Sequence, residues 1–330
     1  MGHEYLDIEN GVVKGFKQGA EHDTVEIPDG VTEIGAGAFR GCTVLESVTI
    51  PGSVKKIGDR AFEGCKVLMD VTISDGVTAI GKSAFMDCNL LMGLSIPDTV
   101  KEIGEYAFVR CDSLLSVNIP NGVKEIGIGT FAQCTSLMGV IIPSSVGKIG
   151  KAAFRNCNKI CHMQLPNGIT EIAEATFLDC LSLVSIDIPD SVTKIGKWAF
   201  VRCKSLKGVT IPDNVTEISE ATFLDCHSLE SIYIPDSVTK IGKGAFVRCR
   251  LLKGVTIPNN VTEIGEYAFA CCSSLTSMTI PNSVMEIGEH AFDGCINLRD
   301  IRYDGTEAQW NAVKKGDECQ QLGVRCLHKS

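Results

Sequence analysis

Cysteine is the residue type with the widest range of possible chemistry in this 330-residue chain, because its sixteen cysteines could form disulfides, hold a metal or act as nucleophiles. Twelve of them recur every 23 residues. A fixed interval places one thiol in each repeat, all pointing the same way, whereas a disulfide or a tetrahedral zinc site needs side chains that converge. We therefore expect a ladder of buried, reduced thiols that act as small hydrophobic residues. The twelve are Cys42, Cys65, Cys88, Cys111, Cys134, Cys157, Cys180, Cys203, Cys226, Cys249, Cys272 and Cys295.

The other four cysteines give weak signals. Cys161 forms the segment Cys157-x-x-x-Cys161-His162, but Cys157 belongs to the ladder, so we expect no metal site. Cys271 is a surface substitution beside a ladder cysteine, and Cys319 and Cys326 could pair near the C-terminus. The chain also lacks Ser/His/Asp spacing, a phosphate-cradling loop and paired catalytic carboxylates, which predicts a protein without catalytic residues, cofactor or enzymatic activity.

The same 23-residue interval governs the whole sequence from 27 to 302, which holds twelve repeats. Such self-similarity predicts a stacked solenoid. In the repeats, alternation such as Ser47-Val48-Thr49-Ile50 predicts a short strand with Val48 and Ile50 inside. Proline ends the strand in all but one repeat, where Ser74 takes its place. The segment from Ala38 to Leu45 has the spacing of a short helical turn.

Two further columns of the repeat carry structural expectations. The phenylalanines, from Phe39 to Phe292, should stack on one another, one from each repeat. The glycine column that begins at Gly35 predicts a backbone angle that other residues resist, although Ala173 and Ser219 replace it in two repeats.

Charged residues alternate in sign from one repeat to the next between 171 and 262. Because adjacent strands lie about 4.8 Å apart, stacking should put Glu171 beside Lys194 and Asp179 beside Arg202. A third ladder should put Glu174 beside Lys197. We favour a role in fixing the register of the stack. The alternative, a charged binding strip, is weakened because alternating signs cancel at a distance.

Candidate binding residues come from two sets of positions. The solvent-facing strand positions are mostly small, and the large exceptions mark possible contacts. The position after the core leucine is apolar in the early repeats, which predicts either an exposed interaction surface or half-buried packing at the rim of the sheet. Together they give the candidate protein-binding residues Met69, Met92, Leu115, Met138, Ile141, His162, Gln164, Asp187 and Tyr233.

Both ends of a solenoid expose its core and need caps. Residues 1–26 are predicted to form an N-terminal β-hairpin cap around Asn10-Gly11, and residues 27–302 the twelve repeats. Residues 303–330 form the predicted C-terminal cap, in which a capping box, Thr306-x-x-Gln309, starts a helix that reaches about Lys315 and places Trp310 over the last repeat.

Composition excludes several function classes. The net charge of −9 and an aromatic content of 6% argue against nucleic-acid binding. No apolar run approaches the length of about 18 residues that a membrane span needs. The first residues have neither a basic start nor an apolar core, so no signal peptide is expected in this chain.

The repeat Cys42-x-x-Leu45-x-x-Val48-x-Ile50-Pro51-x-x-Val54-x-x-Ile57-Gly58-x-x-Ala61-Phe62 resembles the BspA-like, or Treponema pallidum-type, leucine-rich repeat. The segment from Tyr303 to Trp310 is similar to the C-terminal segment of that family. The resemblance covers all twelve repeats and implies a right-handed leucine-rich-repeat coil. In that fold a parallel β-sheet forms the concave face, and short turns or 3-10 or helical turns lie opposite.

The resemblance also implies a function. Proteins of this kind are typically surface-exposed or secreted adhesins, so we expect a non-catalytic solenoid that binds a host matrix or cell-surface protein through its concave face. The implied location is the cell surface or the exterior. The alternative is an intracellular protein-interaction scaffold in the cytoplasm, which the many unpaired cysteines favour.

Overall fold

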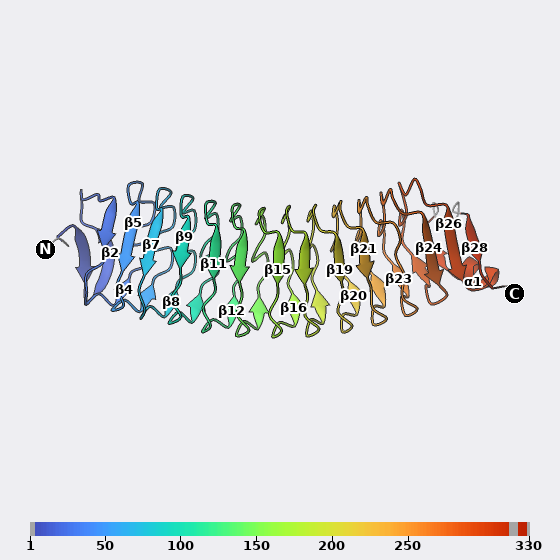
Figure 1. Ribbon diagram of the computed structural model, residues 1–330, viewed down its shortest axis with the longest axis horizontal. Helices are drawn as coiled ribbons and strands as arrows, with labels where there is room; N and C mark the ends of the chain where they lie inside the picture. The colour runs from blue at the N-terminus through green and yellow to red at the C-terminus, as the bar shows by residue number, and fades with distance from the viewer. Residues whose placement is uncertain (1–3, 317–322, 329–330) are drawn as a thin grey trace. The chain divides into compact units, whose positions relative to one another are not determined.

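The computed structural model describes residues 4–316 and 323–328. The chain packs into two compact units, residues 1–168 (unit 1) and 169–330 (unit 2). Each unit is a coil of parallel strands with almost no helix, as Figure 1 shows, and the leucine-rich-repeat coil predicted from the repeats is confirmed. Most turns of the coil contribute a longer strand and a two-residue strand, so that each unit has two columns of strands; in one turn Thr256 forms only an isolated bridge with Thr279.

In unit 1 the longer strands are paired in parallel with an offset of 23 residues, for example Ser47 with Asp70 and Val48 with Val71. Side chains of a strand alternate between its two faces, and Val48 and Ile50 are buried while Thr49 is exposed. We call the exposed side of the longer strands the strand face. The longer strands of unit 1 are β3 (Thr24–Glu26), β5 (Ser47–Ile50), β7 (Asp70–Ile73), β9 (Gly93–Ser95), β11 (Ser116–Asn118), β13 (Gly139–Ile141) and β15 (His162–Gln164).

The two-residue strands of unit 1 form a second parallel column, again with an offset of 23 residues. They are β4 (Glu33–Ile34), β6 (Lys56–Ile57), β8 (Ala79–Ile80), β10 (Glu102–Ile103), β12 (Glu125–Ile126) and β14 (Lys148–Ile149). At the N-terminus, β1 (Leu6–Glu9) and β2 (Val12–Phe16) pair antiparallel around Asn10-Gly11, and β2 continues the column by pairing with β4.

Unit 2 repeats this arrangement within itself. Its longer strands are β17 (Ser185–Asp187), β19 (Gly208–Thr210), β21 (Ser231–Tyr233), β24 (Ser277–Pro281), β26 (Asp300–Asp304) and β28 (Val324–Cys326). Its short strands are β16 (Glu171–Ile172), β18 (Lys194–Ile195), β20 (Glu217–Ile218), β22 (Lys240–Ile241), β23 (Glu263–Ile264), β25 (Glu286–Ile287) and β27 (Lys314–Lys315).

Stacked phenylalanines fill the core of each unit, as the sequence predicts. From Phe39 to Phe154 in unit 1, successive ring centroids are 5.1 to 5.8 Å apart and the rings are within 9° of parallel. From Phe177 to Phe292 in unit 2, the spacing is again 5.1 to 5.8 Å. Phe16 covers Phe39 edge-on at 5.2 Å. A rung, which is one turn of the coil, is therefore stabilised by its neighbours on both sides rather than by its own contacts alone.

The helical turn expected from Ala38 to Leu45 is wrong. The segment is a run of tight turns, with the Cys42 N–H donating to the Phe39 carbonyl at 3.0 Å. The Phe39 N–H instead donates to the carbonyl of Ala61 in the next rung, at 2.7 Å. Two rungs after that of Phe39, Ser83 and Asp87 have φ of 53° and 61°, a left-handed conformation that ends a right-handed helix. Hydrogen bonds between rungs thus replace those within a helix.

The backbone angle expected for the column of Gly35 is also wrong, because Gly58, Gly81 and Gly104 do not have a positive φ. The reason for glycine is the close approach of the neighbouring rung. A Cβ on Gly58 would lie 2.7 Å from the Ile34 carbonyl oxygen and 2.8 Å from the carbonyl carbon of Gly35. Such distances leave no room for a side chain.

Three rungs relax this constraint, and they share a buried threonine where the others have alanine. Thr176 and Thr222 donate to the carbonyls of Ala173 and Ser219, both at 2.8 Å. In the third, Thr130 donates to the Gly127 carbonyl, and a Cβ on Gly127 would meet nothing closer than 3.4 Å. The threonine rungs are therefore the ones that hold, or have space for, a side chain at the glycine position.

The twelve ladder cysteines form no disulfides, and ten of them are buried. Their thiols do more than fill space, because thiols along the ladder donate to the carbonyl of the phenylalanine in the preceding rung. Cys65 reaches Phe39 at 3.0 Å and Cys226 reaches Phe200 at 3.1 Å. Burial raises the pKa of the Cys65 thiol from 9.0 to about 12, so this thiol is protonated and unreactive at neutral pH.

The C-terminal helix α1 spans Glu307–Ala312 and begins with the predicted capping box between Thr306 and Gln309. It ends before the expected Lys315, because Val313 is extended and β27 (Lys314–Lys315) pairs with β25. The Trp310 ring lies 5.2 Å from that of buried Tyr303. Cys319, which could pair with Cys326, lies outside the described residues.

Candidate functional site

Several charges beside the short strands are paired with opposite charges of the neighbouring rung. Lys194 lies 2.7 Å from Glu171 and Arg202 lies 2.9 Å from Asp179, so two of the three predicted ladders are confirmed at these pairs. In the third ladder the Lys197 ammonium bonds Glu220 of the next rung at 2.8 Å, and Glu174 also raises the pKa of Lys197. Matched pairs of this kind leave little net charge for a partner, which favours the register role over the charged binding strip.

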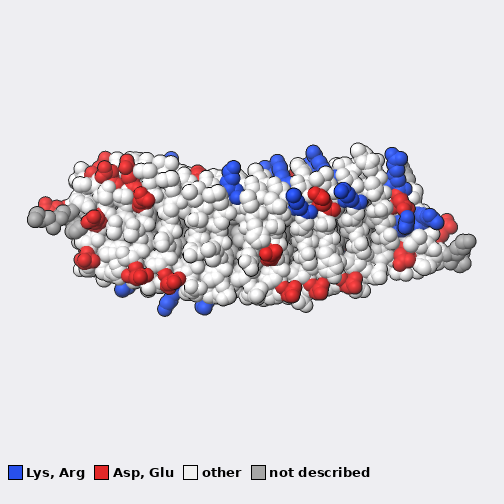
Figure 2. Space-filling view, in the orientation of Figure 1, with Lys and Arg blue, Asp and Glu red and all other residues white. Residues whose placement is uncertain are grey.

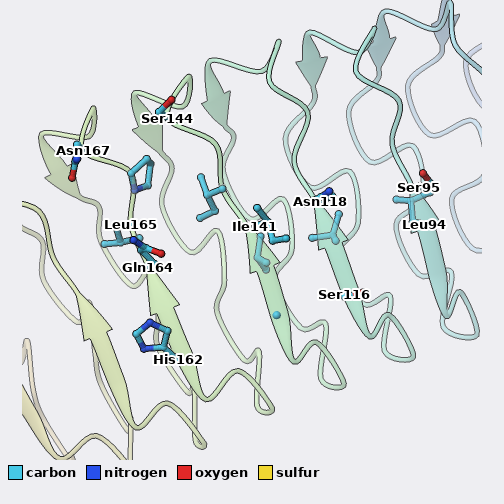
Figure 3. A pocket seen from close by; sticks show the side chains of 15 residues that line it. Leu94, Ser95, Ser116, Asn118, Ile141, Ser144, His162, Gln164, Leu165 and Asn167 are labelled. Carbon is cyan, nitrogen blue, oxygen red and sulfur yellow. The ribbon is translucent and has the colours of Figure 1, made fainter.

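The strand face of unit 1 contains a groove of about 850 Å³ that brings three candidate binding residues together. His162 and Gln164 project from β15 and Ile141 from β13, as Figure 3 shows. Ile141 is 67% exposed. Gly139 lines the floor, and a Cβ there would meet no atom within 4 Å, so the groove is open above it.

Polar groups surround the apolar residues of this groove. Asn118 and Ser95 stand on the neighbouring strands, and Ser144 and Asn167 lie at the turns that follow the strands (Figure 3). These four residues were not among the candidates, because a small polar residue on a strand or turn gives no signal that distinguishes a groove from ordinary solvent exposure. The arrangement offers apolar contact together with hydrogen-bond donors and acceptors.

An apolar ridge runs along one edge of the same strand face. Met92, Leu115 and Met138 are 50%, 45% and 57% exposed, whereas Met69 is less exposed. The Leu115 N–H donates to the Met92 carbonyl and the Met138 N–H to the Leu115 carbonyl, which places the three on successive rungs. Leu90, also exposed, was not among the candidates because it lies before the core leucine, Leu91, whereas the candidates were taken from the position after it.

The strand face of unit 2 holds a separate groove of about 830 Å³. It is lined by the remaining two candidates, Asp187 on β17 and Tyr233 on β21, and Tyr233 is 55% exposed. Between them lie Gly208 and Thr210 of β19. Each of the two grooves thus gathers some of the candidate residues within its own unit.

The described part of the chain contains neither a candidate metal site nor a candidate membrane helix. Within residues 4–316 and 323–328, no group of three or more His, Cys, Asp or Glu side chains is placed to hold a metal ion. Cys161 bonds the carbonyl of Lys159 at 3.4 Å, while Cys157 belongs to the buried ladder. Among the same residues, no helix has the length and apolar character that crossing a membrane requires.

Stacked parallel rungs and open strand faces define a leucine-rich-repeat solenoid of the protein-interaction class. The chain belongs to the family described as the BspA type leucine rich repeat region, which matches residues 13–138, 124–253 and 239–311. The resemblance seen in the repeats is thereby confirmed. No curated protein matches the chain.

Three solved structures are similar over nearly the whole chain. A leucine rich cell surface protein from Faecalibacterium prausnitzii is 31% identical, with 94% of this chain and 95% of that one covered and a TM-score of 0.62. A leucine-rich repeat protein from Bacteroides ovatus is 29% identical, with 98% and 97% covered and a TM-score of 0.68. The pneumococcal vaccine antigen PcpA, 20% identical with 98% and 96% covered and a TM-score of 0.61, shares the fold.

Proposed function

We propose that this protein is a non-catalytic adhesin, exposed on the cell surface or secreted, that binds a host matrix or cell-surface protein through its strand face. The observation that carries the proposal is the apolar ridge of Met92, Leu115 and Met138 beside the groove that contains Ile141. Monomeric proteins seldom expose a contiguous apolar surface without a partner for it. The similar protein from Faecalibacterium prausnitzii is described as a cell surface protein, which supports the location.

The groove favours a protein ligand over a small molecule. It is an open trough on a sheet surface rather than an enclosed cavity, whereas small-molecule sites bury most of their ligand. Exposed apolar residues at the centre with polar groups such as Asn118 and Asn167 around them match the composition of protein interfaces. Methionine side chains adapt their shape to a partner, which suits the exposed Met92 and Met138.

Filling the groove without disturbing the fold tests the proposal. Gly139 lies on β13 with free space above it, so Gly139→Tyr adds a ring to the floor and leaves the core unchanged. The immobilised chain is exposed to extracts of solubilised host matrix and host cell surfaces, and captured proteins are quantified by mass spectrometry. We expect Gly139→Tyr to lower capture by about tenfold or more.

Lys124→Tyr is the matched control, because Lys124 is exposed next to β12, in the column of short strands. This variant should capture as the unmodified chain does, and both variants should melt at the same temperature as that chain. Equal capture by Gly139→Tyr and the unmodified chain would contradict binding through the strand face of unit 1.

An intracellular scaffold is the second candidate, and the free thiols favour it. Cys161 and Cys271 are exposed and unpaired, a state that a reducing compartment preserves. Brief protease treatment of intact producing cells separates the two candidates. Loss of the protein from undamaged cells supports the adhesin, and full protection until the cells are lysed supports the scaffold.

A further inference from the structure

The strand face of unit 2 carries charges of opposite sign along its two edges. We call the residues before the longer strands the basic rim and those after them the acidic rim. In the part of Figure 2 that shows unit 2, Lys and Arg follow one edge and Asp and Glu the opposite edge, with a mostly uncharged surface between. The basic rim comprises Lys204, Lys207, Arg250, Lys253 and Arg299, and the acidic rim comprises Asp190, Asp213 and Asp236; all eight are exposed.

These rim charges are not used within the protein. Among the described residues none of the eight forms an ion pair, whereas beside the short strands of unit 2 Lys194, Lys197 and Lys243 each have a carboxylate within 2.8 Å. One acidic residue, Glu230, interrupts the basic rim between Lys207 and Lys253, and it too has no ion pair. The charges around the strand face therefore remain available to a partner.

From β19 to β24 the floor between the rims is low and has one large side chain, whereas Asp187 and Arg302 stand on the flanking strands β17 and β26. Gly208, Ser231, Gly254 and Ser277 occupy successive rungs, and a Cβ on Gly254 would meet no atom within 4 Å. Tyr233 stands above this floor, 55% exposed, in the groove of about 830 Å³. At about 3.3 Å per residue the seven residues from Lys207 to Asp213 span about 20 Å, which accommodates a helix about 10–12 Å in diameter.

We propose that unit 2 binds an amphipathic α-helix of a partner protein that lies along the groove, across the strands. Its acidic side chains face the basic rim, its basic side chains face the acidic rim, and Tyr233 packs against its apolar stripe. This inference rests on the proposed strand-face function and specifies the chemistry of the partner. A flat partner, such as the strand face of a second copy, would leave the hollow of the groove unfilled, and voids at an interface forfeit contacts.

The charges of the two rims should determine the direction in which the helix lies along the groove as well as its affinity. A helix with acidic and basic flanks meets both rims favourably in one direction along the groove and unfavourably in the other. If the sign of both rims is reversed, the same helix binds again after turning end for end. Reversal of one rim alone leaves repulsion in either direction.

The experiment uses the full chain and synthetic helical peptides about 18 residues long, measured by fluorescence anisotropy at low salt. One peptide has Glu and Lys on opposite flanks of an apolar stripe, and a second has the same composition with the charges mixed between the flanks. We expect the segregated peptide to bind about tenfold more tightly than the mixed one, with a preference that weakens as salt is added.

Three variants test the rims. Lys207→Glu, Lys253→Glu and Arg299→Glu together should weaken binding of the segregated peptide about tenfold or more, as should Asp190→Lys, Asp213→Lys and Asp236→Lys together. The variant with all six changes should recover binding. These side chains are exposed and unpaired, so circular dichroism should show the same fold in each case.

Equal binding of the two peptides, or failure of the six-fold variant to recover it, would overturn the inference. So would tight binding of heparin combined with no preference between the peptides, because the basic rim would then be a polyanion site. The Gly139→Tyr capture experiment concerns the groove of unit 1 and is independent of the rims. If capture depends on Gly139 while the rim variants have no effect, the proposed function stands and the helix proposal fails.

Discussion

Replacing Gly265 by alanine tests why glycine is required where adjacent rungs approach. A Cβ on Gly265 would lie 2.6 Å from the Lys243 nitrogen and 2.7 Å from the Gly242 carbonyl carbon. Neither atom can move without separating two rungs and straining the hydrogen bond from the Gly265 N–H to the Ile241 carbonyl, at 2.8 Å. Overpacking costs about 1–3 kcal/mol and a weakened hydrogen bond about 1 kcal/mol, so we expect a loss of about 2–4 kcal/mol in the free energy of unfolding.

The threonine rungs supply the control and a rescue. Gly127→Ala should be neutral or stabilise by up to about 1 kcal/mol, because its Cβ would meet nothing closer than 3.4 Å and alanine reduces the entropy of the unfolded chain. Adding Ala268→Thr to Gly265→Ala should recover part of the loss, as Thr222 accompanies Ser219. Urea unfolding followed by circular dichroism measures all three. Equal effects of Gly265→Ala and Gly127→Ala would refute the close-approach argument.

Three further predictions concern the core and the surface pairs. Phe200→Ala should destabilise unit 2 by about 3–5 kcal/mol, because Phe200 stacks on rings at 5.6 and 5.3 Å on its two sides. The loss should be larger than that of Phe292→Ala at the end of the column, and thermal unfolding of the two variants checks this order. The pKa of the Cys65 thiol is raised from 9.0 to about 12 in the folded protein, so the stability that the protonated thiol contributes is complete below pH 9 and is lost as pH rises through 12. The free energy of unfolding should therefore fall less steeply over that range in Cys65→Ala than in the unmodified protein. Lys194→Glu should cost no more than about 1 kcal/mol. Glu171→Lys added to it should restore only part of that loss, because Glu217 also attracts Lys194 and would repel a carboxylate there. The coupling measured by this double-mutant cycle should shrink at high salt.

The repeat itself made the fold predictable. Because the interval of 23 residues is unbroken, the partners of every strand follow from one register, as Val48 with Val71 shows. Columns of phenylalanine, cysteine and opposite charge follow from the same register. The residues inside one rung were harder to predict, because hydrogen bonds to neighbouring rungs, such as that from Phe39 to Ala61, override the local preference for a helical turn.

The glycine column shows what a single repeat cannot reveal. A glycine that recurs at one position of the repeat fits either a special backbone angle or a close contact, and only the distance between rungs, as at Gly58, decides between them. The substitutions at Ala173 and Ser219 did carry a signal, because each has threonine three residues later.

Candidate site residues were predictable only as exceptions within columns. Ile141 and Tyr233 are exposed because their strand position faces solvent, which the alternation of the strand gives directly. The grooves depend equally on what is missing, such as a side chain at Gly139, and on turn residues such as Asn167. The distribution of unpaired rim charges emerges only when the ion pairs beside the short strands are known.

Oxidation of methionine side chains is the most direct test that the strand face binds the ligand. Met92 and Met138 lie on the apolar ridge at 50% and 57% exposure, and Met285, at 65%, lies beside the short strand β25 and serves as the control. With a captured host protein bound, the oxidation rates of Met92 and Met138 by dilute peroxide, followed by mass spectrometry, should fall while that of Met285 is unchanged. Protection of Met285 with no change at Met92 and Met138 would contradict the assignment of the binding surface.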